Sequence, residues 1–135
     1  MYQDLVYELA DLKRFTVEKK EKTPIDYLSE GCQDEVEVSI EQLHPCIARI
    51  KLILKGCVIS RASTNAVCLE IEGKSSEEAS KIVNSFLLFL DRKECDLTCL
   101  SDRLKLFERF SSSKSRYSCL RKGALLIQKI LQEDR

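Results

Sequence analysis

The chain lacks the charge excess and the long apolar run that would point to nucleic acid or to a membrane. Its 22 basic residues balance its 22 acidic residues, so the formal net charge is zero. Because domains that bind nucleic acid usually carry a basic excess, we expect no nucleic-acid partner. The apolar run from Phe86 to Leu90 is far too short to span a bilayer, so we expect no membrane segment.

The sequence also lacks the marks of a secreted protein. Residues 1–11 carry acidic side chains where a signal peptide would carry basic ones. The seven cysteines are an odd number, whereas a secreted disulfide scaffold normally has an even number to pair. Both observations predict a cytoplasmic protein with reduced thiols, which bind metal, react or fill the core.

No internal repeat and no second domain can be recognised in the 135 residues. A mass of 15.5 kDa is typical of one domain, so we expect a single domain over residues 1–135. The composition, with 44% hydrophobic and 33% charged residues, is that of a globular chain rather than a disordered one.

Hydrophobic periodicity predicts one helix, then a hairpin, then a series of helices. The expected helices cover residues 2–13, 59–72, 76–90, 97–107 and 120–131, and the expected strands cover 36–40 and 46–55, with a turn at 43–45. Gly73 is expected to end one helix, and the capping-box pattern from Ser75 to Glu78 to begin the next. This order predicts an α+β domain, with helices packed on one face of a small antiparallel sheet.

The remaining segments and thiols receive simpler interpretations. The charged stretch 14–22 is expected to be a solvated loop, and residues 111–115 a serine-rich loop. His44 is expected at the surface of the hairpin turn. Cys46 and Cys68 fall on apolar faces and are expected in the core, whereas Cys95 and Cys99 are expected to be partly exposed thiols near a helix end.

Four possible metal ligands stand at the edges of the predicted elements: Cys32, Asp34, Cys57 and Cys119. Three thiolates and one carboxylate would suit a tetrahedral zinc ion. Cys57 and Cys119 lie near predicted helix N-termini, where the helix dipole favours the thiolate form. Residue type and spacing alone nevertheless favour the simpler interpretation that these cysteines are small buried side chains.

Three segments around these residues resemble the IscU/NifU N-terminal/SufU family of iron–sulfur assembly proteins. The block GCVISRAS at 56–63, followed by a Gly-Lys pair at 73–74, is similar to the family's G-C-x-I-S-x-A-S and G-K pattern. Residues 32–34 (CQD) resemble the family's C-G-D, and residues 116–119 (RYSC) resemble the R-I-K-C of the SufU branch. The spacing from Cys57 to Cys119 matches the longer SufU form.

The resemblance implies an IscU/SufU-like fold and a zinc site formed by Cys32, Asp34, Cys57 and Cys119. It implies that Cys32 accepts sulfur from a SufS-like cysteine desulfurase and passes it to a downstream Suf scaffold. The chain would then act as a zinc-dependent sulfurtransferase together with the desulfurase. Arg116 would support the site through a charge-assisted hydrogen bond to Asp34. With the resemblance, metal or sulfur chemistry is favoured over simple burial.

Three positions depart from the family pattern, and two other functions stay open. Gln33 replaces the glycine of C-G-D, Ser118 replaces a basic residue, and residues 11–16 stand where the family has H-x-x-N-P-R. The first alternative is a scaffold that assembles and transfers a labile [2Fe–2S] cluster on the same thiols, for which the absence of a histidine at Ser118 is unfavourable. The second is an interaction module with purely structural zinc.

Overall fold

The structure, a computed structural model, describes residues 2–17, 35–43, 45–111 and 114–133. The predictions for Cys32, Asp34 and His44 therefore lie outside the described residues, as does the rest of the segment 18–34. In chain order the elements are α1 (Tyr2–Ala10), β1 (Glu35–Leu43), β2 (Cys46–Lys55), α2 (Val58–Ile71), α3 (Ser76–Leu90), η2 (Leu97–Cys99), α4 (Asp102–Lys105), η3 (Leu106–Phe110) and α5 (Lys114–Glu133).

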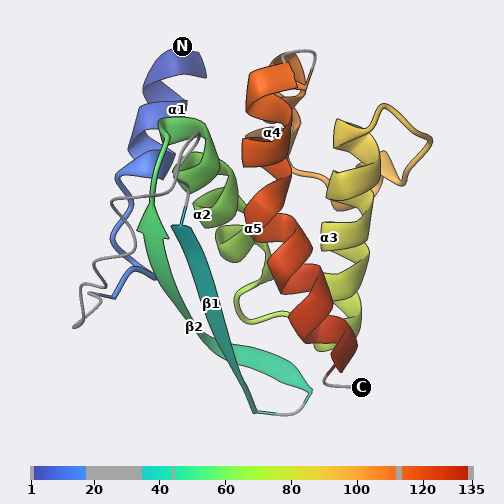
Figure 1. Cartoon of the computed structure of the whole chain (residues 1–135). Helices are drawn as coiled ribbons and strands as arrows, with labels where there is room; N and C mark the ends of the chain where they lie inside the picture. Colours follow the sequence, from blue (N-terminus) through green and yellow to red (C-terminus); the bar gives the residue numbers. More distant parts are fainter. Residues whose placement is uncertain (1, 18–34, 44, 112–113, 134–135) are drawn as a thin grey trace.

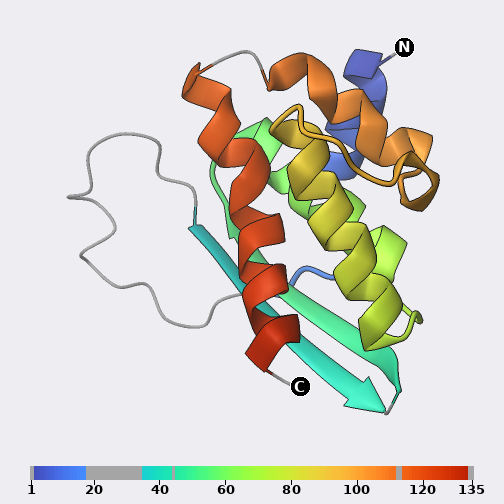
Figure 2. The ribbon, with the colours of Figure 1, turned by 90° about the vertical axis from the view of Figure 1, so that its right-hand side faces the viewer.

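The predicted α+β class is confirmed. β1 and β2 form a two-stranded antiparallel sheet, and α5 contacts β1 while α2 contacts β2. Figures 1 and 2 show α2, α3 and α5 together on one side of the hairpin. In the part of the chain that the structure describes, no helix is both long enough and apolar enough to cross a bilayer.

The hairpin contains a β-bulge that changes which side chains of β2 point inward. Glu41 pairs with Arg49 but Gln42 pairs with Ile47, so Ala48 is an extra residue in β2. Because side chains alternate along a strand, one extra residue reverses the pattern beyond it. Ile47 consequently points into the core.

The bulge explains the wrong prediction for Cys46. Ile50 and Leu52 are buried as the alternation predicts, and they lie on the unaltered side of the bulge. Cys46 lies beyond it and is exposed, rather than part of the core. The sequence gives no sign of the bulge, because Ala48 fits either face.

A short segment after α1 also contributes to the core. The Leu52 N–H donates to the Phe15 carbonyl and the Val17 N–H donates to the Leu52 carbonyl, both over 2.8 Å. Residues 15–17 thus lie along β2, and Phe15 is buried. The prediction of a solvated loop is wrong for Phe15, because this one aromatic side chain has a site between the sheet and the helices.

The chain reverses between α2 and α3 as predicted. Gly73 has φ of +81°, the left-handed conformation that commonly follows a helix end. The Ser75 hydroxyl accepts a hydrogen bond from the Glu78 N–H over 3.1 Å and caps α3. Both turn signals in the sequence therefore have the structural role expected of them.

The predicted helix over 97–107 is instead divided into η2, α4 and η3. The Asp96 carboxylate accepts from the Thr98 N–H over 3.0 Å, and the Ser101 hydroxyl donates to the Glu70 carboxylate. Such short polar side chains compete with a continuous helix for hydrogen bonds. The leucine spacing is helical, but Asp96 and Ser101 start new turns.

The last helix begins earlier than predicted. α5 starts at Lys114, within the expected serine-rich loop, so Cys119 lies in its second turn rather than at its opening. α5 packs closely on α2: a Cβ added to Gly123 would lie 2.1 Å from Thr64 Oγ1. The Ser63 hydroxyl donates to the Leu120 carbonyl over 2.8 Å. These contacts define the position of α5 along α2.

Candidate functional site

Cys57 caps α2 in the predicted position. Its backbone is extended (φ −72°, ψ 157°), and its Sγ accepts a hydrogen bond from the Ser60 N–H over 3.4 Å. The side chain is half-buried. An amide donor at the positive end of a helix dipole is a favourable neighbour for a negatively charged sulfur.

α5 brings a second pair of predicted residues to the same end of the molecule. α2 and α5 run in the same direction, so their N-termini lie together (Figures 1 and 2). Arg116 is exposed near the start of α5, and Cys119 is buried in the following turn. The carbonyl of the next residue, Leu120, accepts a hydrogen bond from the Ser63 hydroxyl of α2.

A pocket of about 680 Å³ lies at these helix ends. Its lining residues come from α1, the start of α2, η3 and the start of α5: Val6, Tyr7, Cys57, Val58, Ile59, Arg109, Phe110 and Arg116. Cys57 and Arg116, which stand far apart in the sequence, thus face a common space. Arg109 and Arg116 are the charged side chains of the described lining.

The structure describes two of the four predicted metal ligands. Cys57 and Cys119 are described, whereas Cys32 and Asp34 are not. Within the described ranges, no three His, Cys, Asp or Glu side chains cluster as a metal site would require. The four-ligand set, and the contact between Arg116 and Asp34, therefore stay predictions.

Solved structures show a closely similar arrangement over nearly the whole chain. One is a protein assigned as an iron–sulfur cluster assembly scaffold of the SUF system (FiSufU) from the thermophile Fervidobacterium islandicum AW-1. It has a TM-score of 0.77 and 23% identity, covering 95% of this chain and 94% of that one.

A second is a nitrogen-fixing NifU-like protein (N-terminal) from Brucella abortus, with a TM-score of 0.71 and 14% identity over 99% of this chain and 95% of that one. The chain has the SufU/NifU-type fold. A third, described only as a hypothetical protein, matches with a TM-score of 0.78 and 18% identity over 97% and 96% of the two chains. No protein-family model and no curated protein sequence matches the chain.

The comparisons confirm the fold that the sequence motifs imply. At these low identities the similarity concerns the path of the backbone. In this chain, the GCVISRAS block lies at a strand-to-helix turn, where Cys57 caps α2. Cys57 therefore stands at a helix N-terminus, as the sequence predicts.

The outer walls of the pocket carry no recognisable signal in the sequence. Tyr7, Arg109 and Phe110 line it from α1 and η3. Tyr7 falls within a predicted helix, but on the face that the periodicity assigns to solvent. No motif marks Arg109 or Phe110, because their place in the wall depends on how η3 packs against the helices.

The other described thiols differ from Cys57. Burial, with a smaller contribution from the charge of Glu72, raises the pKa of the Cys68 thiol well above its ordinary value.

Cys95 and Cys99 are half-buried, as predicted. The Cys99 Sγ donates to the Asp96 carboxylate over 3.4 Å. Hydrogen bonds from the Thr98 side chain, then its backbone, then Cys99 hold the pKa of Asp96 below its usual range.

Proposed function

We propose that the protein is an iron–sulfur cluster assembly protein that accepts sulfur from a cysteine desulfurase in the cytoplasm. The observation that carries the proposal is the shared pocket of Cys57 and Arg116, with Cys119 in the next turn of α5. Cys57 matches the family's G-C-x-I-S-x-A-S pattern, Arg116 and Cys119 match the R-I-K-C of the SufU branch, and the chain has a SufU/NifU-type fold.

Zinc is the metal that suits the proposed donors. Cys57 and Cys119 supply soft sulfur ligands, and Cys32 and Asp34 would complete a set of three thiolates and one carboxylate. When bound, zinc would hold the thiols in their deprotonated form. The chain itself contributes the Ser60 N–H at the Cys57 sulfur, and Arg116 would orient Asp34.

The sulfur acceptor in this proposal is Cys32. Its thiolate attacks the terminal sulfur of the desulfurase persulfide, and a new S–S bond forms on Cys32. The S–S bond of the donor breaks, and the donor cysteine leaves as a thiolate, so no oxidant or reductant is consumed. The sulfur then passes to a downstream Suf scaffold by the same exchange.

Persulfide mapping tests the acceptor. The purified chain is mixed with a SufS-like desulfurase and cysteine, and the persulfide is located by mass spectrometry. We expect it on Cys32, and we expect Cys32→Ala to lose the stimulation of desulfurase turnover. Cys46→Ala is the matched control, because this exposed thiol lies on the hairpin away from the pocket. Equal stimulation by Cys32→Ala and the native chain would rule out Cys32 as acceptor.

A second candidate function is a scaffold that builds a labile [2Fe–2S] cluster on the same thiols. The assignment of the Fervidobacterium protein as a scaffold favours it. Metal analysis of freshly purified protein separates the two. About one zinc per chain supports sulfur transfer, whereas iron with labile sulfide, and passage of an intact cluster to an apo-protein, supports the scaffold.

A further inference from the structure

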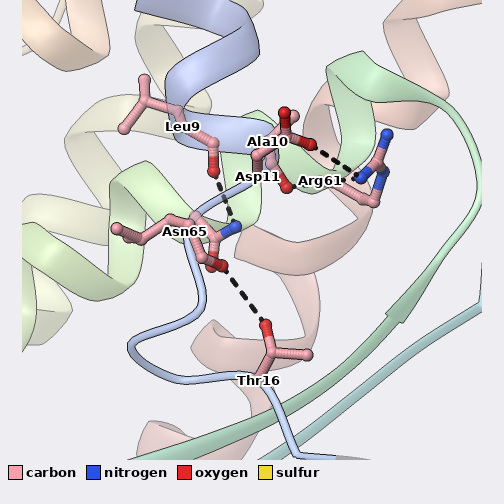
Figure 3. A network of polar contacts seen from close by, with 7 residues as sticks. Leu9, Ala10, Asp11, Thr16, Arg61 and Asn65 are labelled. Atoms are coloured by element: carbon pink, nitrogen blue, oxygen red, sulfur yellow. Dashed lines mark hydrogen bonds and ion pairs between the residues drawn. The ribbon is translucent and has the colours of Figure 1, made fainter.

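The face of α2 that carries Cys57 also holds α1 in place. Cys57, Arg61 and Asn65 recur every four residues, so they form one stripe along α2. The Asn65 amide donates to the Leu9 carbonyl over 2.8 Å, and the Arg61 guanidinium donates to the Ala10 carbonyl over 3.4 Å. Figure 3 shows both side chains directed at the end of α1.

α1 depends on this attachment. It has nine residues, and isolated helices of that length are marginal in water. The Leu9 carbonyl accepts from the Leu12 N–H over 3.3 Å and gains a second donor in Asn65, and the Ala10 carbonyl accepts from Arg61. Arg61 also pairs with Asp11 over 3.6 Å, and its positive charge suits the negative end of the helix dipole.

The two side chains that attach α1 to α2, Asn65 and Arg61, differ in burial. Asn65 is fully buried, so its hydrogen bond to Leu9 is shielded from water. Arg61 is half-buried and Asp11 exposed, so this pair is a weaker surface contact. Val6 and Leu9 bury the apolar side of α1 in the core. We therefore assign Asn65 the larger part of the attachment.

One turn from this attachment, α1 forms a wall of the pocket. Val6 and Tyr7 line the pocket together with Cys57. If α1 moves away from α2, that wall moves with it and the space around Cys57 widens. We propose that Asn65, with support from Arg61, positions α1 over Cys57 and thereby controls which molecules reach this thiol.

This inference concerns the access to Cys57 and can be tested without zinc or a desulfurase. The Cys57 thiol is alkylated in the full chain, after incubation with a chelator, by either a bulky maleimide or the small reagent iodoacetamide. Trypsin cleaves after Lys55 and Arg61, so Cys57 is followed in the peptide 56–61. The ratio of the two rates reports access, because thiol ionisation affects both rates alike.

We expect Asn65→Ala to raise the ratio of bulky to small reagent rates about tenfold, which corresponds to ~1.4 kcal/mol of lost α1 docking. Ser63→Ala is the matched control. It removes a hydrogen bond of the same length from an almost equally buried α2 residue, but toward Leu120 of α5. We expect this control to leave the ratio near the native value.

Arg61→Gln provides a second variant that keeps its fold, because Arg61 is only partly buried. We expect a smaller rise of the ratio, about twofold, measured with a protease that cleaves independently of Arg61. An unchanged ratio in Asn65→Ala would overturn the inference. An equal rise in Ser63→Ala would also overturn it, because it would show that losing any buried hydrogen bond of α2 loosens the protein. If the chain binds no zinc and accepts no sulfur, but Asn65→Ala alone still raises the ratio of the two rates, only the proposed function is overturned.

Discussion

Two cysteines on one helix show how position determines chemistry in this protein. Cys57 caps the N-terminus of α2, half-buried beside a pocket with two arginines. Cys68 lies near the other end of α2 and is completely buried among apolar side chains. The residue type and the helix are the same, yet only one of these thiols has access to a reaction partner.

The difference arises from what packs at each end of α2. At the N-terminal end, α1, η3 and α5 leave a pocket, and an amide N–H faces the Cys57 sulfur. At the C-terminal end, burial stabilises the neutral form of the Cys68 thiol. A cysteine in such surroundings acts as a small apolar side chain.

The largest loss of stability is expected from Gly123→Ala, which disturbs the middle of α2 where this helix packs on α5. The added methyl would lie 2.1 Å from Thr64 Oγ1, and Thr64 is held by its hydrogen bond to the Ser60 carbonyl over 2.8 Å. Overpacking of this kind costs ~3 kcal/mol, against a gain of ~1 kcal/mol in helix propensity. We expect a net loss of about 2 kcal/mol in the free energy of unfolding, measured in urea.

The control for Gly123→Ala is Ser118→Ala, an exposed position on the same helix. We expect its free energy of unfolding to stay within about 0.5 kcal/mol of the native value. If Gly123→Ala is equally stable, α2 and α5 do not approach as closely as described. The proposal of a common site for Cys57 and Cys119 would then lose support.

An intermediate change in the free energy of unfolding is expected from serine substitutions at Cys68 and Cys57, which test the difference between the two thiols. Cys68→Ser places a hydroxyl in an apolar site and should lower the free energy of unfolding by about 1–2 kcal/mol. Cys57→Ser should change it by less than ~0.5 kcal/mol in chelator-treated protein, because serine is a good N-cap residue. Urea unfolding of both variants checks this, and equal losses would contradict the contrast.

The smallest change in the free energy of unfolding is expected at alkaline pH. The pKa of Cys68 is raised above its ordinary value of 9.0 in the folded chain. Above about pH 9 the unfolded chain therefore loses a proton that the folded chain retains, and stability falls by up to ~1.4 kcal/mol per pH unit. Below that pH the contribution is fully present.

Cys68→Ala removes this titrating group. We expect its free energy of unfolding to fall less steeply between about pH 8 and about pH 10 than that of the native chain, in chelator-treated samples. Parallel pH profiles of the two proteins would show that Cys68 is not the group responsible.

Much of the local structure follows from short-range patterns. The cap at Ser75, the end of α2 before Gly73 and the place of Cys57 at a strand-to-helix turn all agree with their predictions. These features depend on residues a few positions apart, so the sequence contains the information directly. The SufU-like motifs likewise pointed to the fold that the solved structures share.

Features that depend on distant contacts were not predicted correctly. The bulge at Ala48 exposes Cys46, and Phe15 is buried although charged residues surround it in the sequence. The division of residues 97–107 reflects polar contacts such as Ser101 with Glu70 of α2. For Phe15 and for residues 97–107 the partner lies far along the chain, whereas the bulge depends on the register of β1 and β2.

For the candidate site, the residue types can be read from the sequence: a thiol at the start of α2, and an arginine and a second thiol near the start of α5. No motif shows that Cys57 and Arg116 share a pocket, or that Tyr7 and Arg109 belong to its walls. Helix ends are specified by local capping, whereas the meeting of two helix ends requires close packing of α2 and α5 at Gly123.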